Sequence, residues 1–323
     1  MKKSSLFNYI TGIFGLLLFN VQSFLFRKLI RSKNAWRLYD EAEIEGFGIN
    51  LVRLYFPVYY DKKVTRQSFS FTSRQQIAQF MSAGDAHHAY NKIIIDELEE
   101  IIKLPVQQTD NITPYLDNYY YGIYDAAVLF AIMEAHKPRK IIEIGSGIST
   151  RYIKHFKNKL GLDTQIVCID PMPRVDIANV ADTVIRQPFE NVIADEIFNL
   201  KSGDIIFMDG SHYVFQGNDT LCFFFKLLPS LPKGIIIHIH DIYLPFDYPE
   251  GVARQLWTEQ YILAAMMSGG FKDLEILYPA YYISQTNDEI KKALIVVTNS
   301  LDLSQFSIKL NHTEGYSIWI RKI

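Results

Sequence analysis

A strand, a glycine turn and the start of a helix follow one another between Ile141 and Thr150, in the run IIEIGSGIST. This junction constrains the fold more than any other part of the chain. Gly145 permits a sharp exit from the strand, and Gly147 lets the backbone approach a ligand closely. The free amides at the start of the following helix favour an anionic group such as a carboxylate. The junction therefore predicts a nucleotide-cofactor site on an α/β fold.

From Tyr124 onward, short apolar strands alternate with helices. We expect strands at Lys140–Ile144, Gln165–Ile169, Thr183–Arg186, Asp204–Met208 and Gly234–Ile239. We expect helices at Tyr124–His136, Thr150–Lys159, Asp219–Leu228 and Val252–Met267. Such alternation predicts a doubly wound, mostly parallel sheet that binds ligands at the carboxyl ends of its strands.

Asp170 ends the second expected strand, about 20 residues beyond the glycine turn, where a carboxylate can accept hydrogen bonds from both ribose hydroxyls of a nucleoside. Two cofactor classes compete for this arrangement. A dinucleotide-binding fingerprint has a third glycine at the position where this chain has Thr150, and it requires no acid inside the first strand. Glu143 is such an acid. A carboxylate two residues before the first glycine can hold the loop amides, and it can lie near the amino group of a methionine moiety. Its alternative role is a buried acceptor for backbone amides.

Several runs carry a more specific resemblance: KPRKIIEIGSGIST, VCIDPMPR, GDIIFMDGSH, and IHIHDIYLPFDYP with WTEQY. They resemble the class I S-adenosylmethionine-dependent methyltransferases, particularly the group with sugar O-methyltransferases and cephalosporin-hydroxylase-like proteins. The resemblance covers Tyr119 to Arg321. It implies S-adenosylmethionine as cofactor and a seven-stranded, mostly parallel Rossmann-like sheet, with a last antiparallel strand supplied by Tyr316–Ile320.

The resemblance also implies which residues bind the cofactor. Asp170 would hold the ribose, and Glu190, after the third strand, would lie near the adenine. Ser149 or Thr150 can cap the helix that follows the turn. The complete expected set is Glu143, Gly145, Ser146, Gly147, Ser149, Asp170 and Glu190.

Acids and histidines follow the next two expected strands. Asp209 and His212 close the fourth strand, and His240 and Asp241 close the fifth. Adjacent parallel strands would bring these four residues together beside the cofactor turn. Methyl transfer needs in-line approach of a nucleophile and removal of its proton, so we expect this group to be catalytic.

The sequence leaves open whether a histidine or a metal manages that proton. Alternation along the fifth strand would put His238 and His240 on one face and Asp241 on the other or in the loop. This geometry argues against all three residues being ligands of one centre. Related proteins hold a divalent metal with an acid after the fourth strand and an acid pair after the fifth. This chain has His240 in place of the first acid of that pair. We expect His212 or His240 to act as base, with a metal on Asp209 and Asp241 as the alternative.

The segment from Ser4 to Phe26 carries no charged residue and is long enough to cross a bilayer core of roughly 30 Å as a helix. Its weakly polar face fits equally well a helix that lies in the membrane interface. A third alternative is a hydrophobic helix packed on the domain or on a second subunit. The basic residues that follow, beginning with Arg27, predict that the rest of the chain faces the cytoplasm.

We therefore expect a membrane-associated helix over residues 1–34, a helical cap or adaptor over 35–118 and a methyltransferase domain over 119–323. The expected reaction is O-methylation of a small-molecule or sugar hydroxyl. An NAD(P)-dependent oxidoreductase and a catalytically idle membrane-associated scaffold are the alternatives. The chain has 33 basic and 35 acidic residues, for a formal net charge of -2, and so lacks the basic excess that nucleic-acid binding needs.

Overall fold

The structure is a computed structural model. It describes residues 68–82, 87–192, 199–249, 252, 255–306 and 314–323. The expected membrane-associated segment, residues 1–34, lies outside the described residues. Within the described part of the chain, no helix is both long enough and apolar enough to cross a membrane. The elements that follow belong to one compact unit, residues 66–249 and 256–323.

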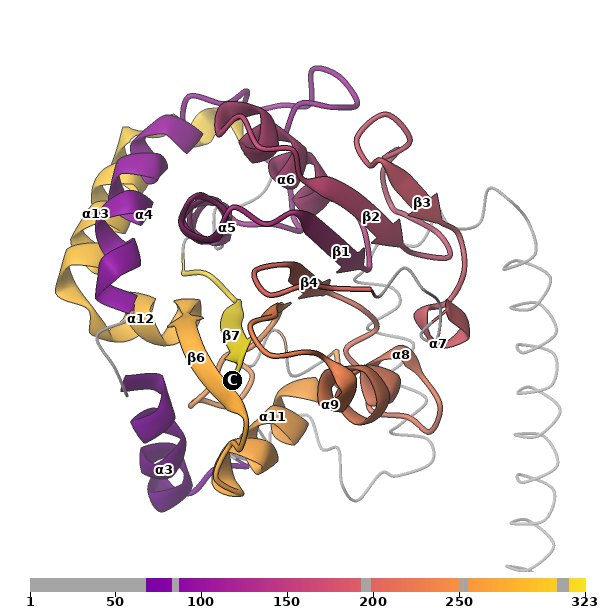
Figure 1. Cartoon of the computed structure of the whole chain (residues 1–323). Coiled ribbons are helices and arrows are strands. Elements are labelled where there is room, and N and C mark those ends of the chain that lie inside the picture. Colours follow the sequence, from indigo (N-terminus) through magenta and orange to yellow (C-terminus); the bar gives the residue numbers. More distant parts are fainter. Residues whose placement is uncertain (1–67, 83–86, 193–198, 250–251, 253–254, 307–313) are drawn as a thin grey trace, which may run out of the picture. The chain divides into compact units, whose positions relative to one another are not determined.

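Seven strands form one sheet in the order β3-β2-β1-β4-β5-β7-β6 (Figure 1). The strands are β1 (Lys140–Ile144), β2 (Gln165–Ile169), β3 (Thr183–Ile185), β4 (Ile205–Met208), β5 (Ile236–Ile239), β6 (Leu274–Pro279) and β7 (Ile318–Lys322). Strands β1 to β5 pair in parallel, whereas β7 pairs antiparallel with both β5 and β6. The predicted fold class is confirmed, including the antiparallel strand near the end of the chain.

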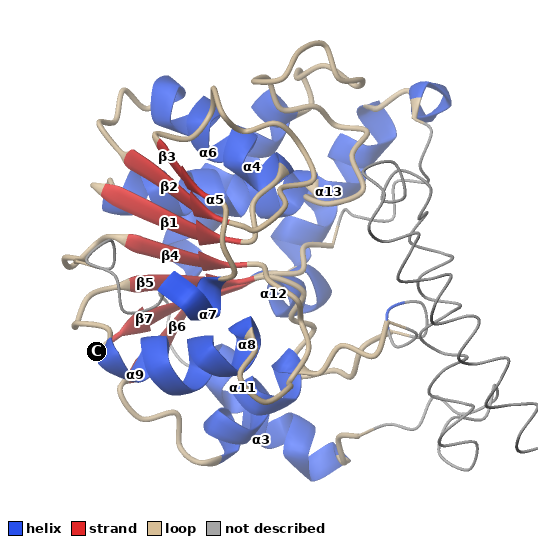
Figure 2. Ribbon diagram, turned by 90° about the vertical axis from the view of Figure 1, so that its right-hand side faces the viewer, coloured by secondary structure: helices blue, strands red, loops and turns tan. Residues whose placement is uncertain are grey.

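Helices cover both faces of the sheet (Figure 2). One face is covered by α4 (His88–Ile101), α5 (Ile123–His136), α6 (Ile148–Lys159), α12 (Ala280–Thr286) and α13 (Asp288–Ser300). The other is covered by α3 (Phe71–Ser82), α7 (Phe189–Val192), α8 (Asp219–Cys222), the π-helix η4 (Phe223–Leu227), α9 (Leu228–Ser230) and α11 (Glu259–Ser268). The single-turn 3-10 helix η5 spans Leu303–Gln305.

The central strands are apolar on both sides because both of their faces are covered. Along β4, Ile205 and Phe207 belong to the core under α5 and α6, while Ile206 and Met208 belong to the opposite core. This is the two-residue alternation of a strand. Because alternate residues enter two different apolar cores, the parallel strands are continuous apolar runs in the sequence.

The structure differs from the sequence-based expectation at several elements. Helix α11 begins at Glu259 rather than at Val252, because Leu256 adopts a φ of 62° that interrupts a helix. The single helix expected over Asp219–Leu228 is divided among α8, η4 and α9. Strand β6 and the helices α12 and α13 were not expected.

Helix α4, which falls in the expected cap, shares a core with α5 and α6 through Tyr90, Ile94 and Leu98. The domain boundaries expected after residues 34 and 118 stay predictions.

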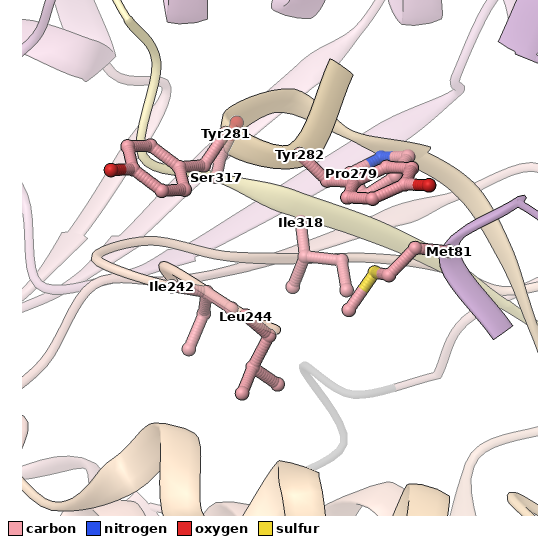
Figure 3. Close-up of a pocket in the computed structure, with 8 residues that line it drawn as sticks. All are labelled: Met81, Ile242, Leu244, Pro279, Tyr281, Tyr282, Ser317 and Ile318. Atoms are coloured by element: carbon pink, nitrogen blue, oxygen red, sulfur yellow. The ribbon is translucent and has the colours of Figure 1, made fainter. Parts of the chain in front are cut away.

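A narrow gap beside β7 (Figure 3) has no room for a water molecule. It is lined by Met81, Ile242, Leu244, Pro279, Tyr281, Tyr282, Ser317 and Ile318. A gap of this size cannot hold a ligand.

Candidate functional site

The strand order reverses between β1 and β4, and open α/β sheets bind ligands at such a switch point. Gly145 follows β1 with a φ of 80°, and a Cβ on it would lie 1.7 Å from the carbonyl oxygen of Asp209. The amide of Asp209 donates a hydrogen bond of 2.8 Å to the carbonyl of Ile144. Only glycine fits here, and the glycine turn therefore lies in direct contact with the end of β4.

Asp170 is oriented toward the glycine turn by two backbone amides. Its Oδ2 accepts a hydrogen bond of 2.8 Å from the amide of Ser146, and its Oδ1 accepts one of 2.7 Å from the amide of Met172. A carboxylate oxygen can accept more than one hydrogen bond, so both oxygens retain capacity for a ligand. The space beside Gly147 is open, because a Cβ there would meet no atom within 4 Å. These residues are arranged as a nucleoside site requires.

Glu143 is fully buried between β1 and α6. Its Oε1 accepts a hydrogen bond of 2.5 Å from the hydroxyl of Ser149, and its Oε2 accepts one from the hydroxyl of Thr150. Burial raises the pKa of Glu143 to about 7, although these hydrogen bonds act to lower it. The carboxyl group thus has the buried acceptor role, with side-chain hydroxyls in place of the backbone amides expected. Its contact with a cofactor stays a prediction.

Glu190 lies half-buried in α7, just after β3. The structure gives it no contact that bears on adenine binding, so that role also stays a prediction.

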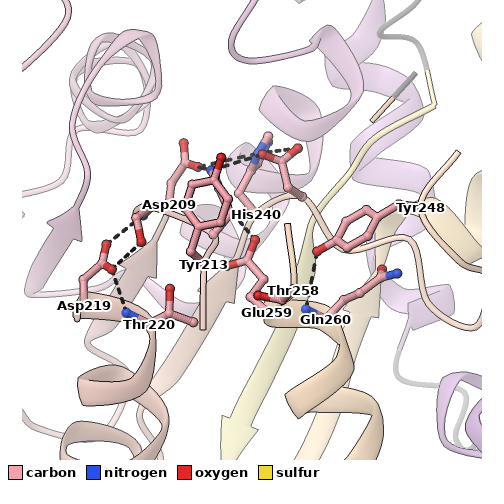
Figure 4. A network of polar contacts seen from close by, with 12 residues as sticks. Asp209, Tyr213, Asp219, Thr220, His240, Tyr248, Thr258, Glu259 and Gln260 are labelled. Carbon is pink, nitrogen blue, oxygen red and sulfur yellow. Dashed lines mark hydrogen bonds and ion pairs between the residues drawn. The ribbon is translucent and has the colours of Figure 1, made fainter. Parts of the chain in front are cut away.

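The ends of β4 and β5 bring Asp209, His212, His240 and Asp241 into one cluster. Figure 4 shows Asp209 and His240 of this cluster. The Nε2 atom of His212 lies 3.5 Å from Asp209 Oδ1 and 3.4 Å from Asp241 Oδ2. The Nδ1 atom of His240 lies 3.9 Å from Asp209 Oδ1 and 3.5 Å from Asp241 Oδ1. All four residues expected from the sequence therefore lie together, and two imidazoles flank two carboxylates.

Asp241 lies in the loop that follows β5, which is one of the two positions expected from strand alternation. Asp241 adopts a φ of 56°, in the left-handed region, and its carboxylate returns to the side of His240. His212 has a similar φ of 62°. Non-glycine residues in this region are uncommon and concentrate at functional sites, where the surrounding structure maintains the strain.

Glu259, at the start of α11, is a member of the site that sequence reasoning missed. The Nδ1–H of His212 donates to Glu259 Oε1 at 2.5 Å, and the amide of Thr258 donates to the carbonyl of His212 at 2.9 Å. Burial alone would lower the pKa of His212, but Glu259, with Asp241 and Asp209, raises it to about 9. Burial raises the pKa of Glu259 to about 7, against the opposing effect of His212. The only signal in the sequence was the run WTEQY.

Asp125, in the first turn of α5, is a second member that was missed. It is fully buried, and its Oδ2 lies 3.8 Å from His240 Nε2, a nitrogen with no hydrogen-bond partner. Burial alone would lower the pKa of His240, but Asp241, Asp209 and Asp125 raise it to about 10. His240 is thus enclosed by carboxylates from three elements.

His238 belongs to the core rather than to the site. It is fully buried, and its ring stacks on that of Phe207 with 3.6 Å between the centroids. Burial, with the charge of His240, keeps its pKa well below the ordinary value. The side chain is therefore a neutral packing group.

Asp209, His240 and Asp241 fit a divalent cation. Each offers one ligand atom, and these atoms all lie within 4.8 Å of one another. Carboxylate oxygens suit hard cations, and an imidazole nitrogen suits transition metals. The set contains the two expected ligands together with His240, which must be unprotonated to bind.

Residues 142–242 match the family model described as "Methyltransferase domain". The match begins in β1, contains the glycine turn and Asp170, and ends just after His240 and Asp241. The match bears out the expected resemblance to methyltransferases over these residues.

Similar solved structures share little sequence with the chain. A CmcI structure with Mg and SAM is 14% identical, with 70% of this chain and 84% of that one covered at a TM-score of 0.35. The SAH-bound methyltransferase PaMTH1 from Podospora anserina is 14% identical, with 80% and 99% covered at 0.37. A putative O-methyltransferase from Klebsiella pneumoniae is 13% identical, with 78% and 99% covered at 0.35. No curated protein sequence matches the chain.

Proposed function

We propose that this methyltransferase domain transfers the methyl group of S-adenosylmethionine to a hydroxyl oxygen of a small-molecule acceptor. The proposal is carried by the direct contact of the glycine turn with the end of β4, at Gly145 and Asp209. The turn offers a place for the cofactor, and the cluster beside it offers groups that accept a proton. In-line positioning and proton removal are what methyl transfer requires of an enzyme.

The cofactor is held at the carboxyl ends of β1, β2 and β3. Asp170 accepts hydrogen bonds from the ribose hydroxyls, and Glu190 lies near the adenine. Amides at the start of α6 bind the carboxylate of the methionine moiety, with Ser146, Gly147 and Ser149 along the turn. Glu143 supports this turn through the hydroxyls of α6.

His212 is the base that removes the acceptor proton. Its Nδ1–H is held by Glu259, which leaves Nε2 to take the proton once the ring is neutral. Glu259 then stabilises the imidazolium that forms, as the carboxylate does in a serine-protease triad. The pKa of about 9 implies that the neutral fraction of His212 increases as the pH rises toward that value.

A divalent metal is the second candidate for managing the acceptor proton, and the donor set of Asp209, His240 and Asp241 favours it. Such an ion would polarise the acceptor hydroxyl and lower its pKa. His212 lies against the same two carboxylates, with its Nε2 atom 3.5 Å from Asp209 Oδ1 and 3.4 Å from Asp241 Oδ2.

A ring-bearing acceptor, such as a sugar, is supported by two aromatic side chains on the loop just after His212. The rings of Tyr213 and Phe215 are stacked with centroids 5.6 Å apart, and Phe215 is 64% exposed. The amide nitrogen of Asn218 donates to the carbonyl of Tyr213 at 2.6 Å and holds this loop. An exposed aromatic surface on a fixed loop offers a flat apolar face for a ring.

Binding of S-adenosylhomocysteine, measured by calorimetry, tests the cofactor site. We expect the wild type to bind it and Asp170→Ala to bind roughly 10- to 100-fold more weakly, because hydrogen bonds to a charged carboxylate contribute about 1.5–3 kcal/mol. Asp163→Ala, which removes an exposed acid in the turn before β2, serves as the control and should leave the affinity unchanged. A wild-type protein that does not bind the ligand refutes the proposed function, and an unchanged affinity in Asp170→Ala refutes the ribose assignment.

A further inference from the structure

His240 introduces a nitrogen donor between two carboxylates. Its Nδ1 atom faces Asp209 and Asp241 at 3.9 and 3.5 Å, so it is the ring nitrogen directed at the common centre of the three residues. Asp241, whose backbone has a left-handed φ of 56°, faces the same centre. The donor set is therefore mixed, with one imidazole and two carboxylates.

The orientation of the His240 ring is determined by its surroundings. The residue is only 4% exposed, and its ring packs against Tyr121 with 5.4 Å between the centroids. A rotation of the ring that exchanged its two nitrogens would turn Nδ1 away from the two carboxylates. Packing against Tyr121 therefore restrains the plane of the ring, and in that plane Nδ1 faces the two carboxylates.

A buried carboxylate lies behind the other ring nitrogen. Asp125 Oδ2 is 3.8 Å from Nε2 of His240, and that nitrogen has no hydrogen-bond partner. Histidines that bind metals usually donate their second N–H to a carboxylate, which sets the tautomer and makes the ligating nitrogen more basic. Asp125 lies on the side of His240 away from the centre, where such a carboxylate would be needed, although at 3.8 Å the contact is longer than a hydrogen bond.

We propose that the site formed by Asp209, His240 and Asp241 selects a divalent transition metal of the Fe²⁺, Co²⁺ or Zn²⁺ class over Mg²⁺. The inference rests on the metal site considered under the proposed function, and it is independent of the acceptor. Imidazole nitrogen favours these ions, whereas Mg²⁺ prefers oxygen ligands and retains much of its water. Asp125 acts through His240, as a positioning residue.

The test measures metal binding rather than turnover. The full-length protein is freed of metal with a chelator and titrated with Co²⁺ and with Mg²⁺, by calorimetry and by the visible absorption of bound Co²⁺. All divalent transition ions bind most sites more tightly than Mg²⁺, so the informative quantity is the ratio of the two affinities and its change in variants.

We expect His240→Glu, which supplies an oxygen ligand, to lower the Co²⁺-to-Mg²⁺ affinity ratio at least about 10-fold. Asp125→Asn keeps all three ligands and should weaken Co²⁺ binding by roughly 10- to 100-fold, as loss of a supporting carboxylate does. His155→Ala, on α6 and outside the cluster, is the control and should change neither affinity. If His240→Glu does not fold, His240→Gln replaces it.

An affinity ratio in His240→Glu equal to that of the wild type overturns the proposal, and so does a wild type that binds neither ion. S-adenosylhomocysteine binding is measured on the same preparations. A protein that binds this ligand without metal selectivity retains the methyltransferase proposal and loses the present one. A protein that selects the transition metal but does not bind S-adenosylhomocysteine retains the present proposal and loses the methyltransferase proposal.

Discussion

Glu143 is a carboxylic acid in the middle of an apolar strand, and its surroundings explain how it is tolerated there. Both oxygens accept hydrogen bonds from the first turn of α6, through Ser149 and Thr150. A buried carboxyl group without such donors would be strongly destabilising. The acid therefore joins β1 to the helix that begins at the cofactor turn.

The pKa of Glu143 makes folding stability depend on pH. Because it is raised from 4.5 to about 7, the contribution of Glu143 to stability is fully present below pH 4.5 and is lost as the pH rises to about 7. We expect the stability of Glu143→Gln, which cannot ionise at this position, not to fall in this way as the pH rises. Urea unfolding of both proteins between pH 5 and 8 should show the variant gaining stability relative to the wild type as the pH rises. A difference that is constant across this range contradicts the prediction.

At the scale of elements, Asp125 connects α5 to the segment that leads into β7. Its carboxylate accepts hydrogen bonds from the amide of Tyr316 at 2.9 Å and from the hydroxyl of Ser317 at 2.5 Å. Strand β7 pairs antiparallel with β5, which carries His238 and leads to His240. One buried acid thus holds a helix against the strand next to the site.

Replacement of Asp125 by alanine tests this connection. The amide and the hydroxyl would be left buried without their acceptor, so we expect the free energy of unfolding to fall by about 2–4 kcal/mol. Denaturant unfolding measures the change. Asp163→Ala removes an exposed acid of the same type and should alter stability by less than about 0.5 kcal/mol. Equal stability of the two variants would show that Asp125 does not hold these elements together.

At the scale of the whole molecule, the charge-free run from Ser4 to Phe26 remains a proposed membrane attachment that leaves the methyltransferase domain on the cytoplasmic side. The described elements form one sheet with helices and an apolar core on each face. We therefore expect these elements to fold without residues 1–34.

Deletion of residues 1–34 is expected to move the protein from the membrane fraction to the soluble fraction without a large change in melting temperature. Cell fractionation and thermal unfolding of the truncated protein are the measurements. A truncated protein that aggregates or melts far below the full-length chain would show instead that the segment packs on the domain, since removal of a packed helix exposes an apolar patch.

The sequence alone determined the features that depend on local chemistry. Strands β1 and β2 lie at the predicted residues, because a buried parallel strand is a short apolar run bounded by turns. Gly145 was recognisable because a left-handed turn after a strand requires glycine. The mostly parallel sheet followed from the alternation of strands and helices.

Only the tertiary structure decided which side chains meet. Glu259 is far from His212 in the sequence, and Asp125 is farther still from His240, so no local pattern pairs them. The return of the Asp241 carboxylate depends on a positive φ, which strand alternation does not predict. Local propensities choose elements, whereas contacts between distant segments set the orientation of individual side chains, and the site is made of such contacts.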